Sequence, residues 1–400
     1  MLLIRYTRSL YKPGIRTIAS TNQVSDLDLY ARRVQRARSD CTDKVHKFDP
    51  SSFLLSKFYP PFLQPIFIAL KAFNIELARI SMGSASTSSS KPYFADMKFT
   101  FWDDQIDKVS QISSHSSPQN STLHGINDPI SILIADSLTK GIRLDLSIFK
   151  QIIYSHKHYL HNEKTKGFSN IDSMCSFGEG TCSQTNYLLQ SICLTPGLYK
   201  YSDFGVNLLE LPETESIRNS LSDICAHIGQ ATAVCSFIIG LKYYAQKNGQ
   251  IALPIDVLAK SGVSQEDALR MVLRGDVSDT KTREALKNAV FEVTTVANDH
   301  IISARSKLQA LKDSIKTKVN EIEKKDDSKT DIEHALLKGY TSLKKGLPDC
   351  LYTPFMASIP TVLYLERLQK YDFDVLNPKL QFKEWRLAYR AYRDYNKRTF

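Results

Sequence analysis

Apolar residues recur at intervals of three and four along most of the chain. The intervals are clearest in three stretches, residues 67–77, 144–152 and 224–238. This spacing places apolar side chains on one side of an α-helix, whereas the alternation typical of strands is scarce. The pattern therefore predicts an all-α fold, in which residues 249–254 form a loop that leads into a new helix.

Three polar segments interrupt this pattern. Residues 81–92 are rich in serine and glycine, residues 113–129 form a second polar connector, and residues 307–346 are heavily charged. We expect loops at the first two segments, and a long exposed helical excursion with a disordered middle at the third. Ser264 lies three residues before Asp267, which predicts a helix start because a serine hydroxyl can cap the first turn.

The C-terminal segment, residues 379–400, has the pattern of an amphipathic helix. Trp385, Tyr389 and Tyr392 share one side of it. The surrounding basic residues are Arg386, Arg390, Arg393, Lys397 and Arg398. Two structures fit this pattern equally well: a helix that lies on an anionic membrane surface, and a terminal helix that packs its aromatic side chains into the core.

Composition and charge narrow the class of protein. With 400 residues, of which 42% are hydrophobic, the chain can bury a large core. The net charge is +10, and residues 1–25 are basic, contain serine and threonine, and have no acidic residue. These traits are typical of a mitochondrial transit peptide, with a disordered basic tail as the alternative. Basic residues do not form a stripe with interleaved aromatics, so we do not expect nucleic acid as a partner.

The cysteines indicate the redox environment of the protein, and the longest apolar runs indicate whether the chain crosses a membrane. The seven cysteines form no C-x-x-C pair and are expected to be reduced and buried. The longest apolar runs, such as residues 231–241, are shorter than the roughly 20 residues needed to cross a bilayer. We therefore expect a protein that is soluble or peripheral on a membrane.

An aspartate triplet has the spacing with which all-helical prenyl-transferring enzymes bind magnesium diphosphate. It consists of Asp103, Asp104 and Asp107. On a helix, the apolar side of this stretch comprises Phe99, Trp102, Ile106 and Val109. The carboxylates lie beside or opposite that side, whereas the ligands of a cavity enzyme must point inward. We interpret the triplet as a solvated helix face.

Two sets of histidines are also candidates for chemistry. His156, His158 and His161 do not share one helical face, so we interpret them as surface histidines rather than a metal site. His227 and His300 lie in apolar helical contexts, which favours hydrogen-bonded histidines in the core or in a cavity wall. The chain has no nucleophile elbow, P-loop or dinucleotide fingerprint.

One stretch, residues 227–269, resembles a known family. Gln230 and the phrases "GQIALP" and "SGVSQEDAL" are similar to the squalene/phytoene synthase superfamily, in which a conserved helix precedes a Leu-Pro loop and a Ser-x-Glu-Asp turn. Residues 58–80 look like the first conserved helix of that superfamily, and the resemblance spans about residues 52–378. It implies one large, isoprenoid-synthase-like helical domain around a central cavity.

The resemblance also locates the expected catalytic positions. Active members carry an Asp-x-x-x-Asp motif on each of two facing helices, and magnesium ions bridge these carboxylates to the substrate diphosphate. The positions that match in this chain are Ile75, Arg79, Phe237 and Leu241. Without magnesium, ionisation of an allylic diphosphate lacks charge neutralisation. The resemblance therefore implies a catalytically inactive member that has no metal or cofactor.

Other phrases point to one branch of the superfamily. "AFNIELARI", "LPIDVLAKSGVSQEDALR" and "YDFDVLNPKLQ" resemble the mitochondrial complex I assembly factor six group. This implies a non-enzymatic protein on the matrix face of the inner membrane, with complex I subunits or assembly intermediates as partners and a cavity for a lipid or prenyl tail. The rival hypothesis is an active isoprenoid transferase that uses the aspartate triplet as unconventional ligands for prenyl diphosphates.

Overall fold

The computed structural model describes residues 25–81, 91–112, 119–164, 167–197, 203–211, 214–274, 279–325, 329–341 and 346–400. Every regular element in these ranges is helical, so the predicted all-α fold is confirmed. Several expectations fall outside them: nearly all of the transit peptide, most of the serine-rich segment, and the middle of the charged segment.

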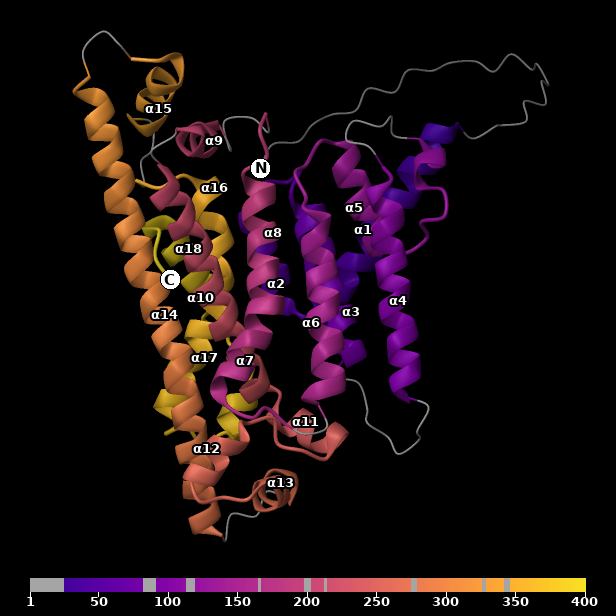
Figure 1. The fold of residues 1–400 in the computed structure, drawn as a ribbon, viewed down its shortest axis with the longest axis vertical. Coiled ribbons are helices and arrows are strands. Elements are labelled where there is room, and N and C mark those ends of the chain that lie inside the picture. Colours follow the sequence, from indigo (N-terminus) through magenta and orange to yellow (C-terminus); the bar gives the residue numbers. More distant parts are fainter. Residues whose placement is uncertain are drawn as a thin grey trace, which may run out of the picture.

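The principal helices run along the long axis of the molecule and pack side by side (Figure 1). The longer ones are α1 (Asp26–Phe48), α3 (Gln64–Ser81), α4 (Lys91–Ser110), α6 (Leu146–Asn162), α10 (Glu215–Ile239), α14 (Thr280–Glu323) and α17 (Ile359–Lys370). The shorter ones are α2 (Pro50–Leu55), α5 (Pro129–Thr139), α7 (Ile171–Gly178), α8 (Gln184–Cys193), α9 (Asp203–Glu210), α11 (Leu241–Asn248), α12 (Ile255–Lys260), α13 (Gln265–Arg274), α15 (Asp331–Thr341), α16 (Asp349–Tyr352) and α18 (Leu387–Lys397). A π-helical turn, Glu179–Ser183, joins α7 to α8.

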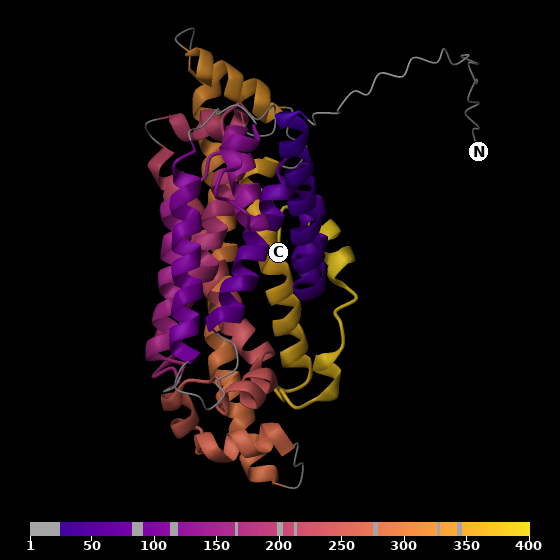
Figure 2. The ribbon, with the colours of Figure 1, turned by 90° about the vertical axis from the view of Figure 1, so that its right-hand side faces the viewer.

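Helix α10 packs along α14 and against α7, α8 and the π-helical turn. Its predicted apolar side is at most 2% exposed and consists of Ile224, Ile228, Ala231, Cys235 and Ile238. A second group, α1, α3, α4 and α5, lies beside these helices (Figures 1 and 2). Helix α6 joins the two groups, because it contacts α3 and α4 as well as α8 and the π-helical turn.

A glycine lets α10 approach the π-helical turn closely. A Cβ atom at Gly229 would lie 2.2 Å from the Oγ atom and 2.3 Å from the backbone nitrogen of Ser183, well inside van der Waals contact. The Ser183 hydroxyl donates a hydrogen bond of 3.0 Å to the carbonyl oxygen of Ala226. A larger residue at position 229 would push α10 away from the turn.

Local signals set the helix ends where the sequence predicts them. The backbone N–H of Asp267 donates to the hydroxyl of Ser264 at 3.0 Å, at the start of α13. Residues 249–254 form the expected loop and lead into α12. Asp128 caps α5 in the same manner, since its carboxylate accepts hydrogen bonds from two backbone N–H groups.

The charged segment is less exposed than its composition suggests. Helix α14, a single helix of 44 residues, extends into this segment as far as Glu323. One side of that portion is buried and comprises Leu308, Leu311, Ile315, Val319 and Ile322. These residues recur every three or four positions between lysines and glutamates, so one side packs while the charges face solvent. Helix α15 packs against α14 and α9.

The cysteines are unpaired, as the sequence predicts. All seven are free, six are buried, and Cys182 is half-buried. Burial raises the pKa of Cys41 and of Cys350 to about 12, which keeps these side chains in the thiol form.

Helix α10 bears on the expectation drawn from the lengths of the apolar runs. By length and composition it is the one helix among the described residues that is long and apolar enough to cross a membrane. However, 56% of its apolar window is buried inside the structure, as in the core helix of a bundle. The apolar run at residues 231–241 covers only part of α10, because polar residues interrupt the apolar positions before it, whereas the mean hydropathy over an 18-residue window stays high.

The C-terminal aromatic residues do not enter the core. Helix α18 and the segment before it cross the outside of the bundle, at the right of Figure 2. Trp385 is 83% exposed, and the residues that α18 buries are Leu387, Ala391 and Asp394. The alternative in which Trp385, Tyr389 and Tyr392 pack into the core is therefore wrong.

Candidate functional site

Ile75 and Arg79, the two residues of α3 that match the Asp-x-x-x-Asp motif of the active enzymes, have different surroundings. Ile75 is half-buried and packs against the core. The guanidinium of Arg79 lies 5.0 Å from the ring centroid of Phe48 and 3.5 Å from the Glu76 carboxylate. Glu76 is in turn 2.7 Å from the ammonium of Lys44. Both Phe48 and Lys44 belong to α1, so Arg79 points toward α1 and not into the middle of the bundle.

The side of α3 that meets α6 and α8 carries neutral polar groups. The amide of Asn74 donates to the hydroxyl of Thr185 at 2.7 Å, and the hydroxyl of Ser81 lies 2.9 Å from Nδ1 of His156. These groups satisfy one another inside the bundle. They have no negative charge to offer a hard cation such as magnesium.

The two family positions on α10 and α11 lie in a closely packed aromatic cluster. Phe237 is 0% exposed and Leu241 is 2% exposed. The Phe237 ring centroid is 4.9 Å from Phe168, 5.5 Å from Phe177, 5.7 Å from Tyr159 and 5.6 Å from Tyr244. Such ring pairs each contribute about 0.5–1.5 kcal/mol beyond the area they bury. The rings of this aromatic cluster fill the space around position 237.

His156 corrects the interpretation of the three neighbouring histidines as surface residues. Its side chain is buried, its Nδ1 is paired with Ser81, and its ring packs edge-on against Phe177 at 5.4 Å. Burial lowers the pKa of His156 from 6.5 to about 3, so the ring is neutral. His158 is exposed, and Nε2 of His161 pairs with Asp96 at 2.9 Å. The three side chains do not converge on one point.

The aspartate triplet lies on the outer face of α4, as predicted. The apolar side is buried and comprises Phe99, Trp102, Ile106 and Val109. Asp104 and Asp107 are exposed, and Asp107 pairs with Lys150 at 2.5 Å. Partial burial raises the pKa of Asp103. Within the described residues, no group of three or more His, Cys, Asp or Glu side chains is arranged to hold a metal ion.

His227 and His300 bind each other at the contact between α10 and α14. Their Nδ1 atoms are 2.9 Å apart, and Nε2 of His300 lies 3.7 Å from the Cys175 sulfur. Both rings are half-buried, and burial lowers the pKa of each. A hydrogen bond between two ring nitrogens needs at least one neutral ring to accept it, so the two rings cannot both be protonated while the bond is kept. This agrees with the interpretation as hydrogen-bonded wall histidines.

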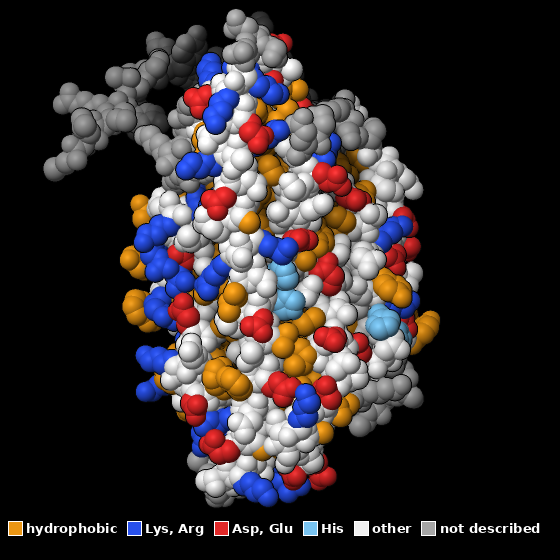
Figure 3. Space-filling model, turned by 60° about the vertical axis from the view of Figure 1, so that its left-hand side comes forward, with side chains coloured by type: hydrophobic (Ala, Val, Ile, Leu, Met, Phe, Trp, Pro, Cys, Tyr) orange, Lys and Arg blue, Asp and Glu red, His pale blue; other side chains and the backbone are white. Residues whose placement is uncertain are grey.

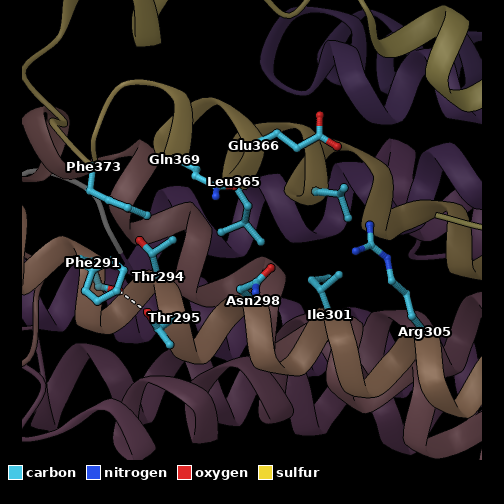
Figure 4. A pocket seen from close by; sticks show the side chains of 11 residues that line it. Phe291, Thr294, Thr295, Asn298, Ile301, Arg305, Leu365, Glu366, Gln369 and Phe373 are labelled. Carbon is cyan, nitrogen blue, oxygen red and sulfur yellow. Dashed lines mark hydrogen bonds between the residues drawn. The ribbon is translucent and has the colours of Figure 1, made fainter.

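A groove between α14 and α17 is the feature that the sequence did not predict (Figure 4). Its volume is about 310 Å³. Phe291 and Phe373 form one end of it, with their ring centroids 4.9 Å apart, and Arg305 and Glu366 lie at the other. The Thr294 side chain is buried, yet its hydroxyl has no hydrogen-bond partner in the part of the chain that the structure describes.

Two residues that line the groove depart from the usual helix pattern and give a weak indication of it in the sequence. Phe291 is 52% exposed on α14, where a polar residue fits the helix pattern better. Thr294 is a β-branched polar residue on the buried side of the same helix. Neither signal identifies α17 as the opposite wall, because α17 is distant in the sequence.

Comparison with known proteins gives one family and several relatives. A family model described as squalene/phytoene synthase matches residues 45–319. The chain is 23% identical over 352 residues to a Bos taurus protein named NADH dehydrogenase (ubiquinone) complex I, assembly factor 6, covering 88% of this chain and 80% of the relative. It is 23% identical over 334 residues to the Drosophila melanogaster homolog, covering 83% and 75%.

Two solved structures share the fold. Squalene synthase HpnC from Alicyclobacillus acidocaldarius superposes with a TM-score of 0.53 at 9% identity, covering 86% of this chain and 97% of that one. A dehydrosqualene synthase in complex with ligand gives a TM-score of 0.53 at 10% identity, covering 91% and 97%. At such low identity the likeness concerns the fold, and it confirms the expected isoprenoid-synthase-like architecture.

The aromatic cluster predicts a large cost for truncating its central ring. Phe237→Ala should lower the free energy of unfolding by about 3–5 kcal/mol, because it leaves a cavity among packed rings. The control Tyr243→Ala removes a ring that is 49% exposed and should cost about 0.5 kcal/mol. Urea denaturation measures both. A small cost at position 237 would indicate an open ligand cavity there instead of a packed core.

The buried neutral His156 predicts loss of stability in acid. The unfolded chain takes up a proton near pH 6.5, whereas the folded ring does so only near pH 3, so the free energy of unfolding falls as the pH drops between these values. At pH 5 this residue should account for about 2 kcal/mol of the loss. Denaturation from pH 7 to pH 5 should show a shallower slope for His156→Asn and an unchanged slope for the exposed control, His158→Asn.

Proposed function

The chain belongs to the squalene/phytoene synthase family, and from this premise we propose that it is a non-enzymatic assembly factor for mitochondrial respiratory complex I. The relatives that span most of the chain support an assembly role, since they carry the name complex I assembly factor 6. Its partners would be complex I subunits or assembly intermediates. The basic, acid-free N-terminus supports a mitochondrial location, at the matrix face of the inner membrane.

The observation that carries the non-enzymatic part is the packing of Phe237. Transfer of a prenyl group from its diphosphate needs carboxylates that hold magnesium against the phosphates. In this chain the matching region of α10 and α11 presents buried rings, and the inward side of α3 presents Asn74 and Ser81. Packed aromatic side chains favour a role as a stable scaffold over a role as a site that opens for each substrate.

The groove between α14 and α17 is our proposed contact for a client subunit. Its floor is apolar and includes Ile301, Val362 and Leu365, and its rim carries exposed amide side chains. An apolar side chain of a partner can pack on this floor. The partner's backbone can then form hydrogen bonds with the amide side chains of the rim and with the Thr294 hydroxyl. A prenyl or lipid tail is the other occupant that would fit the same floor.

Disruption of the gene, followed by native-gel separation of respiratory complexes, tests the assembly role. We expect assembled complex I to fall several-fold while the other complexes stay constant, and the wild-type gene should restore it. Normal complex I in the disrupted strain would contradict the proposed function.

Two variants in the same disrupted strain test the groove. Phe291→Asp should fail to restore complex I, because it places a charge at the apolar end of the groove. The matched control is Ile302→Asp, on the same helix, where the wild-type residue is likewise 52% exposed but does not line the groove. Equal rescue by both variants would remove the groove from the proposal and leave the assembly role standing.

A turnover assay tests the rival hypothesis of an active isoprenoid transferase. Purified protein with magnesium and farnesyl or geranylgeranyl diphosphate should release no pyrophosphate above background. If turnover does occur, the triple variant Asp103→Asn, Asp104→Asn and Asp107→Asn shows whether the aspartate triplet supplies the ligands. Loss of turnover in that variant would establish the rival mechanism.

A further inference from the structure

The C-terminal edge, which we define as residues 379–397, exposes four large aromatic side chains together. The exposed fractions are 70% for Phe382, 83% for Trp385, 69% for Tyr389 and 64% for Tyr392. Hydrophobic and basic side chains alternate along the left margin of the molecule in Figure 3, where this edge lies. Single exposed apolar residues are ordinary, but a contiguous group of this kind marks an interaction surface.

The arginines of this edge hold it onto the bundle. Arg386 and Arg390 both pair with Glu366 of α17, at 3.4 Å and 2.8 Å. Arg390 and Arg393 pair with the fully buried carboxylate of Asp394, at 2.6 Å and 2.8 Å. Arg386, Arg390 and Arg393 still surround the aromatic side chains, but they are half-buried and paired with carboxylates, whereas Lys397 is exposed. Their guanidinium groups form ion pairs with carboxylates of the protein itself, and these ion pairs hold the C-terminal edge in a fixed conformation.

The segment before α18 is fixed in the same way, with its aromatic residues pointing outward. Arg367 donates hydrogen bonds to the carbonyl oxygens of Lys379 and Phe382, the latter at 3.0 Å. Lys379 and Lys383 are exposed and, among the described residues, pair with no carboxylate. Lysines are thus the groups that carry positive charge outward from the edge.

We propose that the C-terminal edge docks the protein on a membrane surface rich in anionic phospholipids. Phe382 and Trp385 enter the interfacial layer, where aromatic rings with a polar surround are stable. Beside them is a cleft of about 490 Å³ whose lining includes Lys370, Lys379 and Lys383. Its two carboxylates, Glu366 and Glu384, are paired with Arg386. Ammonium groups in such a cleft are placed to meet lipid phosphates.

Charge selects this edge over a second exposed aromatic patch. Helix α4 exposes Tyr93 by 66%, Phe94 by 56% and Phe101 by 45%. However, α4 carries four acidic and three basic residues, whereas residues 379–397 carry two acidic and six basic ones. Part of the charge on each element is paired, since Asp107 and Asp96 of α4 lie beside Lys150 and Lys157 of α6. Lys379 and Lys383 remain exposed on the C-terminal edge, so an anionic surface attracts this edge more strongly than the patch on α4. The α4 patch therefore supplies matched controls.

Vesicle flotation with the purified full chain tests the proposal. Wild-type protein should float with phosphatidylcholine vesicles that contain phosphatidylglycerol, and much less with phosphatidylcholine alone. The double variant Phe382→Ser and Trp385→Ser, and the double variant Lys379→Glu and Lys383→Glu, should each lower the bound fraction about tenfold. The controls Tyr93→Ser with Phe94→Ser, and Lys98→Glu with Lys108→Glu, should bind like wild type.

Three outcomes would overturn the proposal. These are no flotation of the wild-type protein, undiminished binding by the C-terminal variants, and equal loss in the α4 controls. All the substituted side chains are exposed, so far-UV circular dichroism and thermal unfolding should match wild type and exclude misfolding. The proposal rests on the proposed function only for the identity of the membrane. Because flotation uses no complex I, its failure leaves the assembly role untouched, and the converse also holds.

Discussion

The close approach of α10 to the π-helical turn is the constraint on which the rest of the structure depends. Gly229 leaves no side chain between the two backbones, and Ser183 ties them together through the carbonyl of Ala226. With α10 set at that distance, Phe237 meets the rings from α6 and α7, and His227 meets His300 of α14. Both groups of helices are therefore positioned relative to one contact.

The same packing relates stability to the proposed non-enzymatic role. In an enzyme of this fold, inward positions on facing helices must stay polar and accessible, which costs burial of apolar area. In this chain those regions hold an aromatic cluster, a neutral histidine and paired neutral side chains such as Asn74 and Thr185. A bundle packed in this manner gains stability from residues that an enzyme would reserve for metal and substrate.

Arginines and lysines on the outer surface have different roles. Arginines of the C-terminal edge form buried or half-buried pairs with Glu366 and Asp394, where their planar, multiply bonded groups suit fixed geometry. Lysines face solvent, where a flexible ammonium suits a mobile anionic surface. Helix α17 lies between the groove and the C-terminal edge, since Glu366 borders both. A client in the groove and a membrane at the edge would therefore be held close together.

The sequence by itself determined the all-α fold, the buried sides of α4 and α10, the cap at Ser264 and the family, because each depends on residues close together in the chain or on short phrases. Only the tertiary structure decided the rest. The burial of His156, the exposure of Trp385, the pairing of the C-terminal arginines and the groove opposite Phe291 all depend on which distant helix lies alongside. Helical periodicity states which residues share a side, and packing against a distant partner decides whether that side is covered.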